Sequence, residues 1–515
     1  MNNTIKDFQA KDILFGKDGI ERVKKGIDIT CNAIKSTIGP CGKNAFIDSE
    51  IQPTITNDGV SIARAVKLKD PFAQMGAWLV NNTCDKTFDD VGDSTTTTAT
   101  LLQAIINESL KRPENPIKIR KSLKACGKTV DKWIKDNAKE IKDTKDIEAV
   151  ATISSESPEV GKLIADIIEK VGKTRPIRVE DGMFSETELE IVEGLETKVG
   201  YSSPLFITNE SEGVAEMEDV LVFASDRQIS SLPDIAVLLE MLKTEKTTSL
   251  VFLVGNMDNA IKGTFALNKK HGLFNSLVIE VRGTELEDMA AAAGATLISD
   301  STGLKLKDVK MEHLGRVKSI SSNARKTLII GEGGEKTKQA IERLRKQAAQ
   351  TKNIYEAQYI NKRADNLEGG IAVIKVGAPT DTEKADLKLK ILNSVNATKS
   401  AIEEGIVEGG GMCLYRAANS IKGGSIGEEI LKVALKAPLR NIVENAGEDY
   451  SDVSKKLIGK KGYNAYTNKT VDMFKEGIID SAKATRCALA NALSSASEFI
   501  TAGVHISSLI EKDDK

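Results

Sequence analysis

The run Gly92-Asp93-Ser94-Thr95-Thr96-Thr97 is the part of the sequence whose residue types suit a phosphorylated ligand. An apolar stretch that predicts a helix follows it, and the free N–H groups at a helix N-terminus attract anions. The threonine hydroxyls add donors, and the Asp93 carboxylate can hold a Mg²⁺ ion that neutralises phosphate charge. The other interpretation of the same run is an Asp N-cap ahead of a Thr-rich but ordinary helix.

Two other turns have the composition of phosphate-binding loops. The turn Thr37-Ile38-Gly39-Pro40-Cys41-Gly42-Lys43 could bring a second helix end to the same ligand, although alone it is a weak indication. The segment from Gly331 to Thr337 superficially resembles a P-loop, but Glu335 stands where that loop needs glycine, and Glu332 would repel a polyphosphate. We therefore interpret the second segment as a strand–turn–helix connection.

Composition and charge argue against several classes of protein. A chain of 515 residues is too long for one ordinary core, so roughly two to four domains are expected. With 72 basic and 74 acidic residues the net charge is -2, which supports neither nucleic-acid binding nor a charge-driven membrane role. The scattered cysteines and isolated histidines favour reduced thiols over a zinc site. Without an apolar leader segment, we expect a cytoplasmic protein.

Hydrophobic spacing predicts the helices that position these turns. Apolar residues at helical spacing predict a helix over residues 12–38, which stops at Gly39-Pro40. A second helical pattern covers about residues 75–137 and breaks at Gly92-Asp93 and again near Pro113 and Pro116. The turn and the Gly92 run therefore both lie at helix ends.

The middle of the chain has a different pattern. Between about Gly194 and Gly370, short β-branched or apolar runs alternate with helical segments, and one more strand follows at residues 371–376. A mixed α/β domain is thus inserted into a mostly helical one. Gly194 and Gly370 stand at its two ends, where the freedom of glycine would serve either a hinge or a plain turn.

Seven motifs then point to one family when they are taken together. They are TIGPCGKN (37–44), TITNDGVSIAR (54–64), GDSTTTTAT (92–100), VEDG (179–182), GGIAVIKVGA (369–378), NATKSAIEEGIVEGGG (396–411) and GYNA (462–465). In this order and spacing they resemble the group I chaperonins, the GroEL type, from about Asp12 to Ser508. The resemblance implies a multidomain α + α/β chaperonin fold.

The resemblance also implies domains and partners. The expected division is a mostly helical equatorial domain (1–136 and 404–515), a small intermediate domain (137–192 and 372–403) and an inserted apical α/β domain (193–371). Proteins of this kind form seven-membered rings, usually paired, that take up unfolded client proteins. A co-chaperonin lid is a further candidate partner, and neither nucleic acid nor a membrane is expected as one.

Carried over by position, the resemblance implies a site for ATP, Mg²⁺ and K⁺. Asp93 would bind Mg²⁺, the Thr37 carbonyl would bind K⁺, and Asp58 would be a carboxylate near the γ-phosphate. The implied nucleotide-binding residues are Thr37, Ile38, Gly39, Pro40, Asn57, Asp93, Ser94, Thr95, Thr96, Thr97, Gly410, Asn464, Ala465, Ile478 and Asp480.

The resemblance further implies an apical groove for clients and the co-chaperonin, and glycine hinges. The groove residues would be Tyr201, Ser203, Leu205, Phe206, Ile235, Leu239, Ile261, Phe265 and Leu267, and the hinges Gly194, Gly370 and Gly405. An exposed apolar surface accepts many client sequences. The other interpretation is that the apolar faces of the two groove helices pack on the sheet.

Several positions depart from the family pattern. Asn393 stands where the family has a catalytic Asp, and an amide cannot act as a base. Asn57 replaces a Lys, and Ser94 replaces a Gly, which is costly if φ is positive there. The chain also lacks most of an apical loop after Val281, and it ends in EKDDK without a Gly-Met tail.

Two functional hypotheses follow. The first is an ATPase that folds clients inside a ring, with hydrolysis that is slow or differently organised because of Asn393. The second is a ring that holds clients or acts as a scaffold, with nucleotide as a structural ligand only. Asp58, Asp93 and Asp480 favour the first hypothesis, whereas Asn393, Asn57 and the missing loop favour the second.

Overall fold

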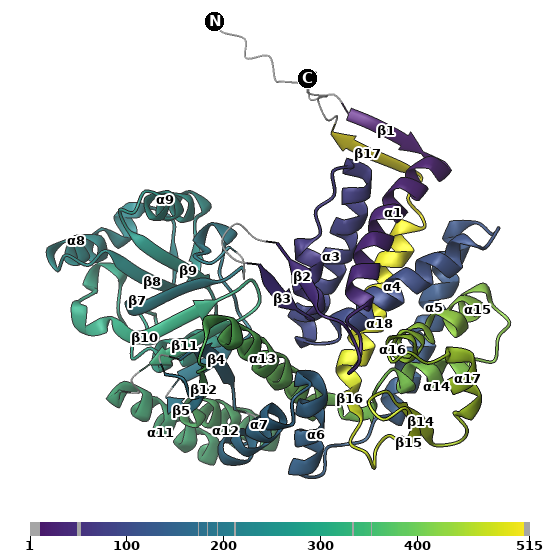
Figure 1. Cartoon of the computed structure of the whole chain (residues 1–515). Coiled ribbons are helices and arrows are strands. Elements are labelled where there is room, and N and C mark those ends of the chain that lie inside the picture. Colours follow the sequence, from purple (N-terminus) through teal and green to yellow (C-terminus); the bar gives the residue numbers. More distant parts are fainter. Residues whose placement is uncertain are drawn as a thin grey trace, which may run out of the picture. The chain divides into compact units, whose positions relative to one another are not determined.

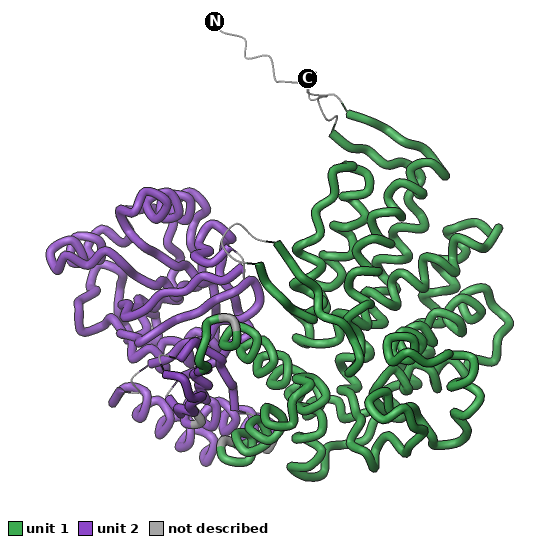
Figure 2. Tube along the Cα trace, viewed as in Figure 1, with its two compact units in different colours: residues 1–173, 378–515 green, residues 174–377 purple. Residues whose placement is uncertain are grey.

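The computed structural model describes residues 11–48, 53–173, 175–182, 184–192, 194–210, 213–331, 334–351 and 353–508. The chain divides into two compact units, residues 1–173 with 378–515 and residues 174–377 (Figure 2). The second unit is therefore inserted into the sequence of the first. Glu332 of the P-loop-like segment and the final EKDDK lie outside the described residues.

Long helices form the core of the first unit (Figure 1). Pro71 and Pro116 begin two of them at the first helical turn, where proline is well tolerated, and the side chains of Asp70 and Asn115 cap their N-termini. Apolar residues along one face of each helix meet in a common buried core. These helices are α1 (Gly16–Lys35), α3 (Pro71–Val91), α4 (Thr95–Leu110), α5 (Pro116–Asn137) and α18 (Ala482–Phe499).

Shorter elements surround this core. Four pairs of strands form small antiparallel ladders: β1 (Lys11–Phe15) with β17 (Val504–Ser508), β2 (Ala45–Ile47) with β3 (Thr54–Thr56), β13 (Ile406–Glu408) with β16 (Ile479–Ser481), and β14 (Lys461–Asn464) with β15 (Lys469–Asp472). The remaining helices are α2 (Gly59–Ala65), α6 (Thr144–Ser155), α7 (Pro158–Val171), α13 (Asp381–Glu404), α14 (Met412–Ser420), α15 (Ile426–Ala434), α16 (Ala437–Asn445) and α17 (Tyr450–Lys456).

The helix predicted over residues 12–38 begins later than expected. Residues 11–15 form strand β1, and α1 starts only at Gly16, which adopts φ +54°. The strand exists because it pairs in register with residues 504–508, so that Ile13 lies opposite Ile506. A partner almost five hundred residues away cannot be inferred from local spacing.

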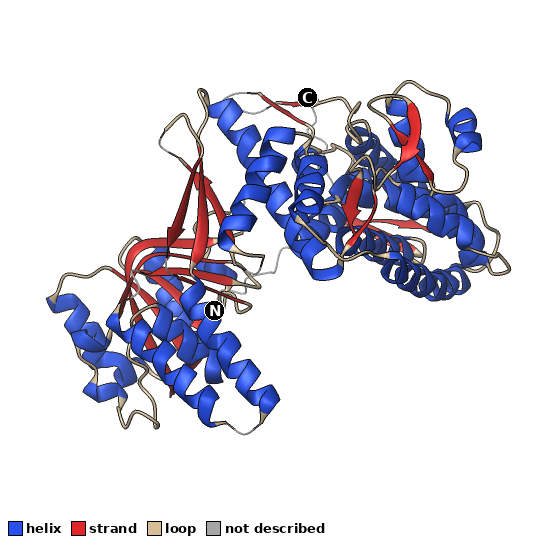
Figure 3. Ribbon diagram, turned by 90° about the horizontal axis from the view of Figure 1, so that it is seen from below, coloured by secondary structure: helices blue, strands red, loops and turns tan. Residues whose placement is uncertain are grey.

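The second unit contains a mixed sheet with helices beside it (Figure 3). The strand order is β6 (Gly194–Thr197), β11 (Thr327–Gly331), β10 (Gly315–Ser322), β7 (Ala215–Ile229), β8 (Ser249–Met257) and β9 (Asn275–Glu280). Strands β7, β8 and β9 are parallel, and the segments by which they pair, at residues 221–224, 250–254 and 277–279, are apolar, as expected of strands covered on both faces. The helices of this unit are α8 (Ala236–Thr244), α9 (Asn259–Lys270), α10 (Gly283–Ala292), α11 (Glu335–Gln350) and α12 (Ile354–Gly369).

A smaller sheet completes the second unit. Strand β12 (Ile371–Val376) lies between β4 (Ile177–Asp181), to which it is parallel, and β5 (Glu188–Val192), to which it is antiparallel. Four short helical turns lie in the connections between β6 and β10 of the larger sheet: η1 (Pro204–Phe206), η2 (Leu232–Ile235), η3 (Leu306–Asp308) and η4 (Met311–His313). The predicted strand at 371–376 therefore belongs to this second sheet, whose other strands the sequence pattern did not indicate.

The three predicted hinge glycines have different local reasons. Gly370 and Gly405 adopt φ +67° and +86°, values that favour glycine. Gly194 instead lies in β6, where an added Cβ would approach the Ile329 carbonyl oxygen and the Ile371 Cδ1 atom to 2.4 Å. Close packing explains Gly194 in this structure, and a hinge role for the three glycines stays a prediction.

His505 is buried where β17 packs on α1. Its side chain is 7% exposed, and neither ring nitrogen has a hydrogen-bond partner among the described residues. A Cβ added at Gly19 would lie 2.3 Å from Nδ1, so the ring rests directly on the helix backbone. Burial lowers the pKa of His505, because the surrounding protein disfavours the charged form.

We expect His505 to make the folded state sensitive to mild acid. A histidine whose pKa is lowered by folding stabilises the protein above its ordinary pKa near 6.5, and this stability is lost as the pH falls below that value, with a limiting slope of about 1.4 kcal/mol per pH unit. His505→Val should therefore lose less stability than the wild type between pH 7.5 and 5, as measured by thermal unfolding. The exposed His271 provides the control, since His271→Asn should keep the wild-type pH dependence. Parallel curves for wild type and His505→Val would contradict the prediction.

Candidate functional site

The Gly92–Thr97 run forms a tight left-handed connection between α3 and α4. Gly92 ends α3 with φ +66°, and Ser94 precedes α4 with φ +63°. The backbone N–H of Ser94 donates to the Asp93 carboxylate, and the Ser94 carbonyl accepts the N–H of Thr98 at 2.9 Å. Asp93 is thereby held at the N-terminus of a 16-residue helix, whose dipole favours negative charge.

Three carboxylates act on one another at this helix end. Burial raises the pKa of Asp93 and the neighbouring Asp58 charge raises it further, whereas the hydrogen bond from the Ser94 N–H and the nearby Ser154 hydroxyl lower it. Burial, with the charge of Asp93, raises the pKa of Asp480 to about 7. The gathered negative charge is the main electrostatic feature of the site.

The loop before α2 reaches the first turn of α4. Asp58 is the N-cap of α2, and its Oδ2 accepts hydrogen bonds from Ser61 N–H at 2.8 Å and Ser61 Oγ at 2.6 Å. A Cβ added at Gly59 would lie 2.6 Å from the Thr96 hydroxyl oxygen and 2.9 Å from that of Thr95. Two helix N-termini therefore meet at Thr95 and Thr96.

The turn at residues 37–43 is fixed by residues that the sequence analysis did not identify. The Asn445 amide donates to the carbonyls of Lys35, Ser36 and Ile38 at 3.1, 3.4 and 3.0 Å, which caps the end of α1. The Cys41 thiol contacts the Ala465 carbonyl at 3.4 Å. Ile38 and Ala465 also share one buried cluster, while Gly39 adopts φ +83° and Pro40 is exposed.

The glycines at positions 409 and 410 and strand β16 lie between the carboxylates at the α4 N-terminus and the cluster that holds the turn at residues 37–43. A Cβ added at Gly409 would meet Asp480 Oδ1 at 3.0 Å, and Gly410 adopts φ +60° beside Ile478. Ile478 packs against the cluster that holds Ile38 and Ala465. Asn464 Oδ1 accepts from the N–H groups of Tyr466 and Thr467 at 3.0 and 3.2 Å, so this oxygen serves the turn after β14.

Helix α13 carries two asparagine side chains, Asn393 and Asn396, near the connection between α3 and α4. A Cβ added at Gly92 would collide with the Asn396 side chain, whose Nδ2 would lie 2.2 Å away. One turn earlier, the Oδ1 atom of Asn393 is buried and has no hydrogen-bond partner among the described residues. Asn57 donates from its Nδ2 to Glu156 Oε2 at 2.8 Å, a contact that the sequence analysis also missed.

The predicted client groove is only partly on the surface of the second unit. Phe206, Ile235, Ile261 and Phe265 are at most 4% exposed and belong to its core, so the prediction that they present an apolar surface is wrong. The Phe265 ring packs on that of Phe252 at 4.8 Å, because α9 turns this face toward the sheet. Leu205 and Leu267 are 67% and 56% exposed, and Tyr201, Ser203 and Leu239 are partly buried.

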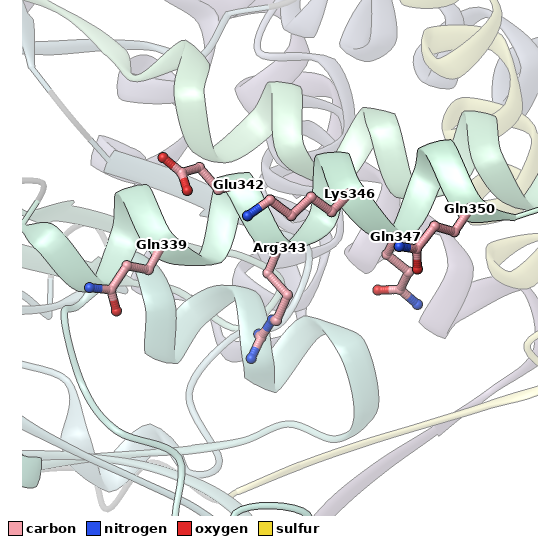
Figure 4. A pocket seen from close by; sticks show the side chains of 6 residues that line it. All are labelled: Gln339, Glu342, Arg343, Lys346, Gln347 and Gln350. Atoms are coloured by element: carbon pink, nitrogen blue, oxygen red, sulfur yellow. The ribbon is translucent and has the colours of Figure 1, made fainter.

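Other features in the described residues do not form a comparable site. The hollow in Figure 4 is lined by six exposed side chains of α11: Gln339, Glu342, Arg343, Lys346, Gln347 and Gln350. Their spacing marks the solvent face of an amphipathic helix. Ser425 lies in a GxSxG spacing at 423–427, but it forms a capping box with Glu428 at the start of α15. The described residues contain no group of three or more acids, histidines or cysteines arranged to hold a metal.

An α/β unit inserted into a helical one, with carboxylates gathered at a helix N-terminus, is the arrangement that the sequence motifs led us to expect of a chaperonin subunit. The model of the TCP-1/cpn60 chaperonin family matches residues 31–259 and 266–506, and the chain therefore belongs to this family. Its function is accordingly that of a chaperonin, which acts in protein folding.

Solved structures with the same fold confirm the expected fold class. The chaperonin gp146 from the bacteriophage EL 2 (Pseudomonas aeruginosa), in the presence of ATP-BeFx, matches in crystal form II with a TM-score of 0.70 and 21% identity, over 97% of this chain and 99% of that one. Crystal form I matches with a TM-score of 0.65 at the same identity and coverage. Among the described residues, no helix combines the length and apolar character needed to cross a membrane.

Ser94 provides a test of the left-handed connection. A side chain at φ +63° costs roughly 1 kcal/mol relative to glycine, because its Cβ crowds the neighbouring backbone. Ser94→Gly should therefore raise the melting temperature, whereas Ser94→Ala, which keeps the Cβ, should not. A lower melting temperature for Ser94→Gly would show that the serine hydroxyl, and not the backbone conformation, decides stability here.

Proposed function

We propose that this chaperonin is ATP-dependent and binds ATP with Mg²⁺ at the N-terminus of α4. The observation that carries the proposal is the group of Asp93, Asp58 and Asp480, in which burial and, after it, the neighbouring carboxylate charges raise the pKa values of Asp93 and Asp480. Mg²⁺ commonly takes one or two carboxylates and completes its shell with phosphate oxygens and water. Such a cation would relieve the repulsion, and the α4 N-terminus would supply donors to the phosphates.

The arrangement of the remaining residues fits a nucleotide. Asp93 would hold Mg²⁺, the Thr37 carbonyl would hold K⁺, and Ser94 with Thr95, Thr96 and Thr97 would contact phosphates. Asp480 and Gly410 would lie at the ribose, and Ala465 and Ile478 at the base. The Asp58 charge acts on Asp93 and the Asp93 charge on Asp480, Gly409 lies against Asp480, and Ile478 packs against the cluster that holds Ala465. The gp146 structures were obtained in the presence of ATP-BeFx, which supports nucleotide binding by analogy.

The proposed assembly is a ring of seven subunits, single or double, that assists the folding of non-native proteins in its cavity. The exposed side chains of Leu205 and Leu267 are the candidate contacts for clients and for a co-chaperonin lid. Exposed apolar side chains of this kind can accept many client sequences. The four buried residues named above would contribute only by supporting this surface from within.

Hydrolysis is proposed to be slow, because the residue at position 393 is an amide. Asn393 can neither accept a proton from water nor supply the charge that supports Mg²⁺. Its buried Oδ1 lacks a hydrogen-bond partner among the described residues, so the position is not occupied in another structural contact through that atom.

Changing Asn393 to Asp should accelerate hydrolysis. A positioned base contributes about 10²–10⁴-fold, so we expect Asn393→Asp to raise the single-turnover rate by at least about tenfold while ATP affinity changes little. Asn393→Ala, which lacks the amide, should hydrolyse ATP no faster than the wild type. Fast wild-type turnover that Asn393→Ala leaves unchanged would contradict the proposal.

The alternative is a ring that binds nucleotide and holds clients without using hydrolysis. The amides at Asn393 and Asn57 favour it, because both remove charge from the expected γ-phosphate region. Refolding of a chemically denatured client separates the two functions. Release of native client only with ATP, with or without a co-chaperonin, is the result we expect, and retention of client under all nucleotide conditions would establish the holdase.

A further inference from the structure

The corner between α6 and α7 holds a glutamate in an unusual conformation. Glu156 follows the last residue of α6 with φ +55° and ψ 22°, a left-handed geometry that costs a non-glycine residue about 1 kcal/mol or more. Ser157 immediately caps α7, since its side chain accepts the N–H of Val160 at 3.3 Å. The corner is therefore fixed on both sides, and the exposed Glu156 side chain leaves it in a defined direction.

That direction is toward the loop of Asp58. Glu156 Oε2 accepts a hydrogen bond from Asn57 Nδ2 at 2.8 Å. Asn57 directly precedes Asp58. Gly59, which directly follows Asp58, lies against the Thr95 and Thr96 hydroxyls. The same end of α6 also reaches Asp93, because the Ser154 hydroxyl lowers the pKa of that carboxyl. Glu156 thus belongs to a segment that borders the site at two points.

Helix α13 faces Glu156 with charged side chains close to Asn393. Lys390 and Asp386 form an ion pair at 2.7 Å, and both act electrostatically on Glu156. Lys390 lies three residues before Asn393, so one turn of α13 separates the charged pair from the amide. Glu156 is consequently a carboxylate placed between the Asp58 loop and the part of α13 that carries Asn393.

The other carboxylates of the site already have structural contacts or a proposed role. Asp58 Oδ2 accepts two hydrogen bonds as a helix cap, Asp93 is the proposed Mg²⁺ ligand, and Asp480 lies beside the Gly-rich segment. Within the described part of the chain, Glu156 accepts its side-chain hydrogen bond from a neutral amide, that of Asn57. It is therefore the carboxylate best able to take up a proton.

We propose that Glu156 supplies the carboxylate that accepts the proton of the attacking water, the role that Asn393 cannot perform. This inference rests on the proposed ATP hydrolysis at the same site. The water oxygen forms a bond to the γ-phosphorus while the bond from phosphorus to the bridging oxygen of ADP breaks. The proton of the water passes to a Glu156 oxygen, and ADP and phosphate are the products.

The surroundings of Glu156 suit a proton acceptor. Although the Glu156 residue as a whole is exposed, partial desolvation of its carboxylate raises the pKa, the Asn57 hydrogen bond and the Lys390 charge lower it, and the Asp386 charge raises it again. A carboxylate whose pKa is raised in this way is a stronger base than an ordinary glutamate.

The test is Glu156→Gln, which keeps the length and the left-handed backbone but removes the base. We expect the affinity for a fluorescent ATP analogue to stay within about twofold, while the single-turnover rate falls about 10². The acidic limb of the pH–rate profile should disappear with the titrating group. The matched control is Glu159→Gln, another carboxylate of the same corner, whose Oε2 accepts from Ser157 Oγ at 3.1 Å and which should behave as wild type.

Two further variants make the result decisive. Glu156→Asp keeps a carboxylate and should retain the pH profile at a reduced rate, which remains measurable if Glu156→Gln does not fold. Adding Asn393→Asp to Glu156→Gln should restore hydrolysis, because a second carboxylate is then available. A Glu156→Gln protein with wild-type rate and pH profile overturns the inference alone, as does one that loses ATP binding instead of turnover. A wild type that binds no ATP overturns the proposed function and this inference with it.

Discussion

The left-handed connection between α3 and α4 is the constraint on which the candidate site depends. It joins the two helices through Gly92, Asp93 and Ser94 and places Asp93 directly before the N-terminus of α4. The absence of a side chain at Gly92 also lets Asn396 of α13 approach the turn, since an added Cβ would come within 2.2 Å of its amide nitrogen. Any larger residue at Gly92 would displace either the Asp93 carboxylate or α13. The site and the helix that covers it are thus coupled through one glycine.

Repulsion between the carboxylates at this connection lowers the stability of the folded state while no ligand is bound. The dipole of α4 offsets part of the negative charge of Asp93, but burial together with that charge still raises the pKa of Asp480 to about 7. A cation with phosphates would replace this repulsion with attraction and use the N–H donors of α4. Ligand binding and folding are therefore linked, because a ligand that binds only the folded state also stabilises it.

The sequence predicted the elements of the site better than their contacts. The composition of Gly92–Thr97 and the breaks between α3, α4 and α5 were visible in local patterns, and the fold class followed from ordered motifs. The Asn445 cap, the Cys41–Ala465 contact and the β1–β17 pairing join segments hundreds of residues apart, which local spacing does not encode. Ile261 and Phe265 were misassigned because α9 carries apolar side chains both against the sheet and on the surface, where Leu267 is exposed, and only the sheet decides which of them are covered.

The two amides that replace charged residues of the chaperonin pattern have opposite electrostatic effects. Asn393 removes a negative charge, whereas Asn57 removes a positive one, so the net charge of the region stays the same. The pair still changes the chemistry, because a lysine at position 57 would hold Glu156 in an ion pair and lower its pKa. The neutral Asn57 amide fixes the Glu156 oxygen at 2.8 Å without neutralising it. With an amide in place of the family's Asp at position 393 and of its Lys at position 57, the carboxylate available to accept a proton is Glu156 at the α6–α7 corner, not a residue of α13.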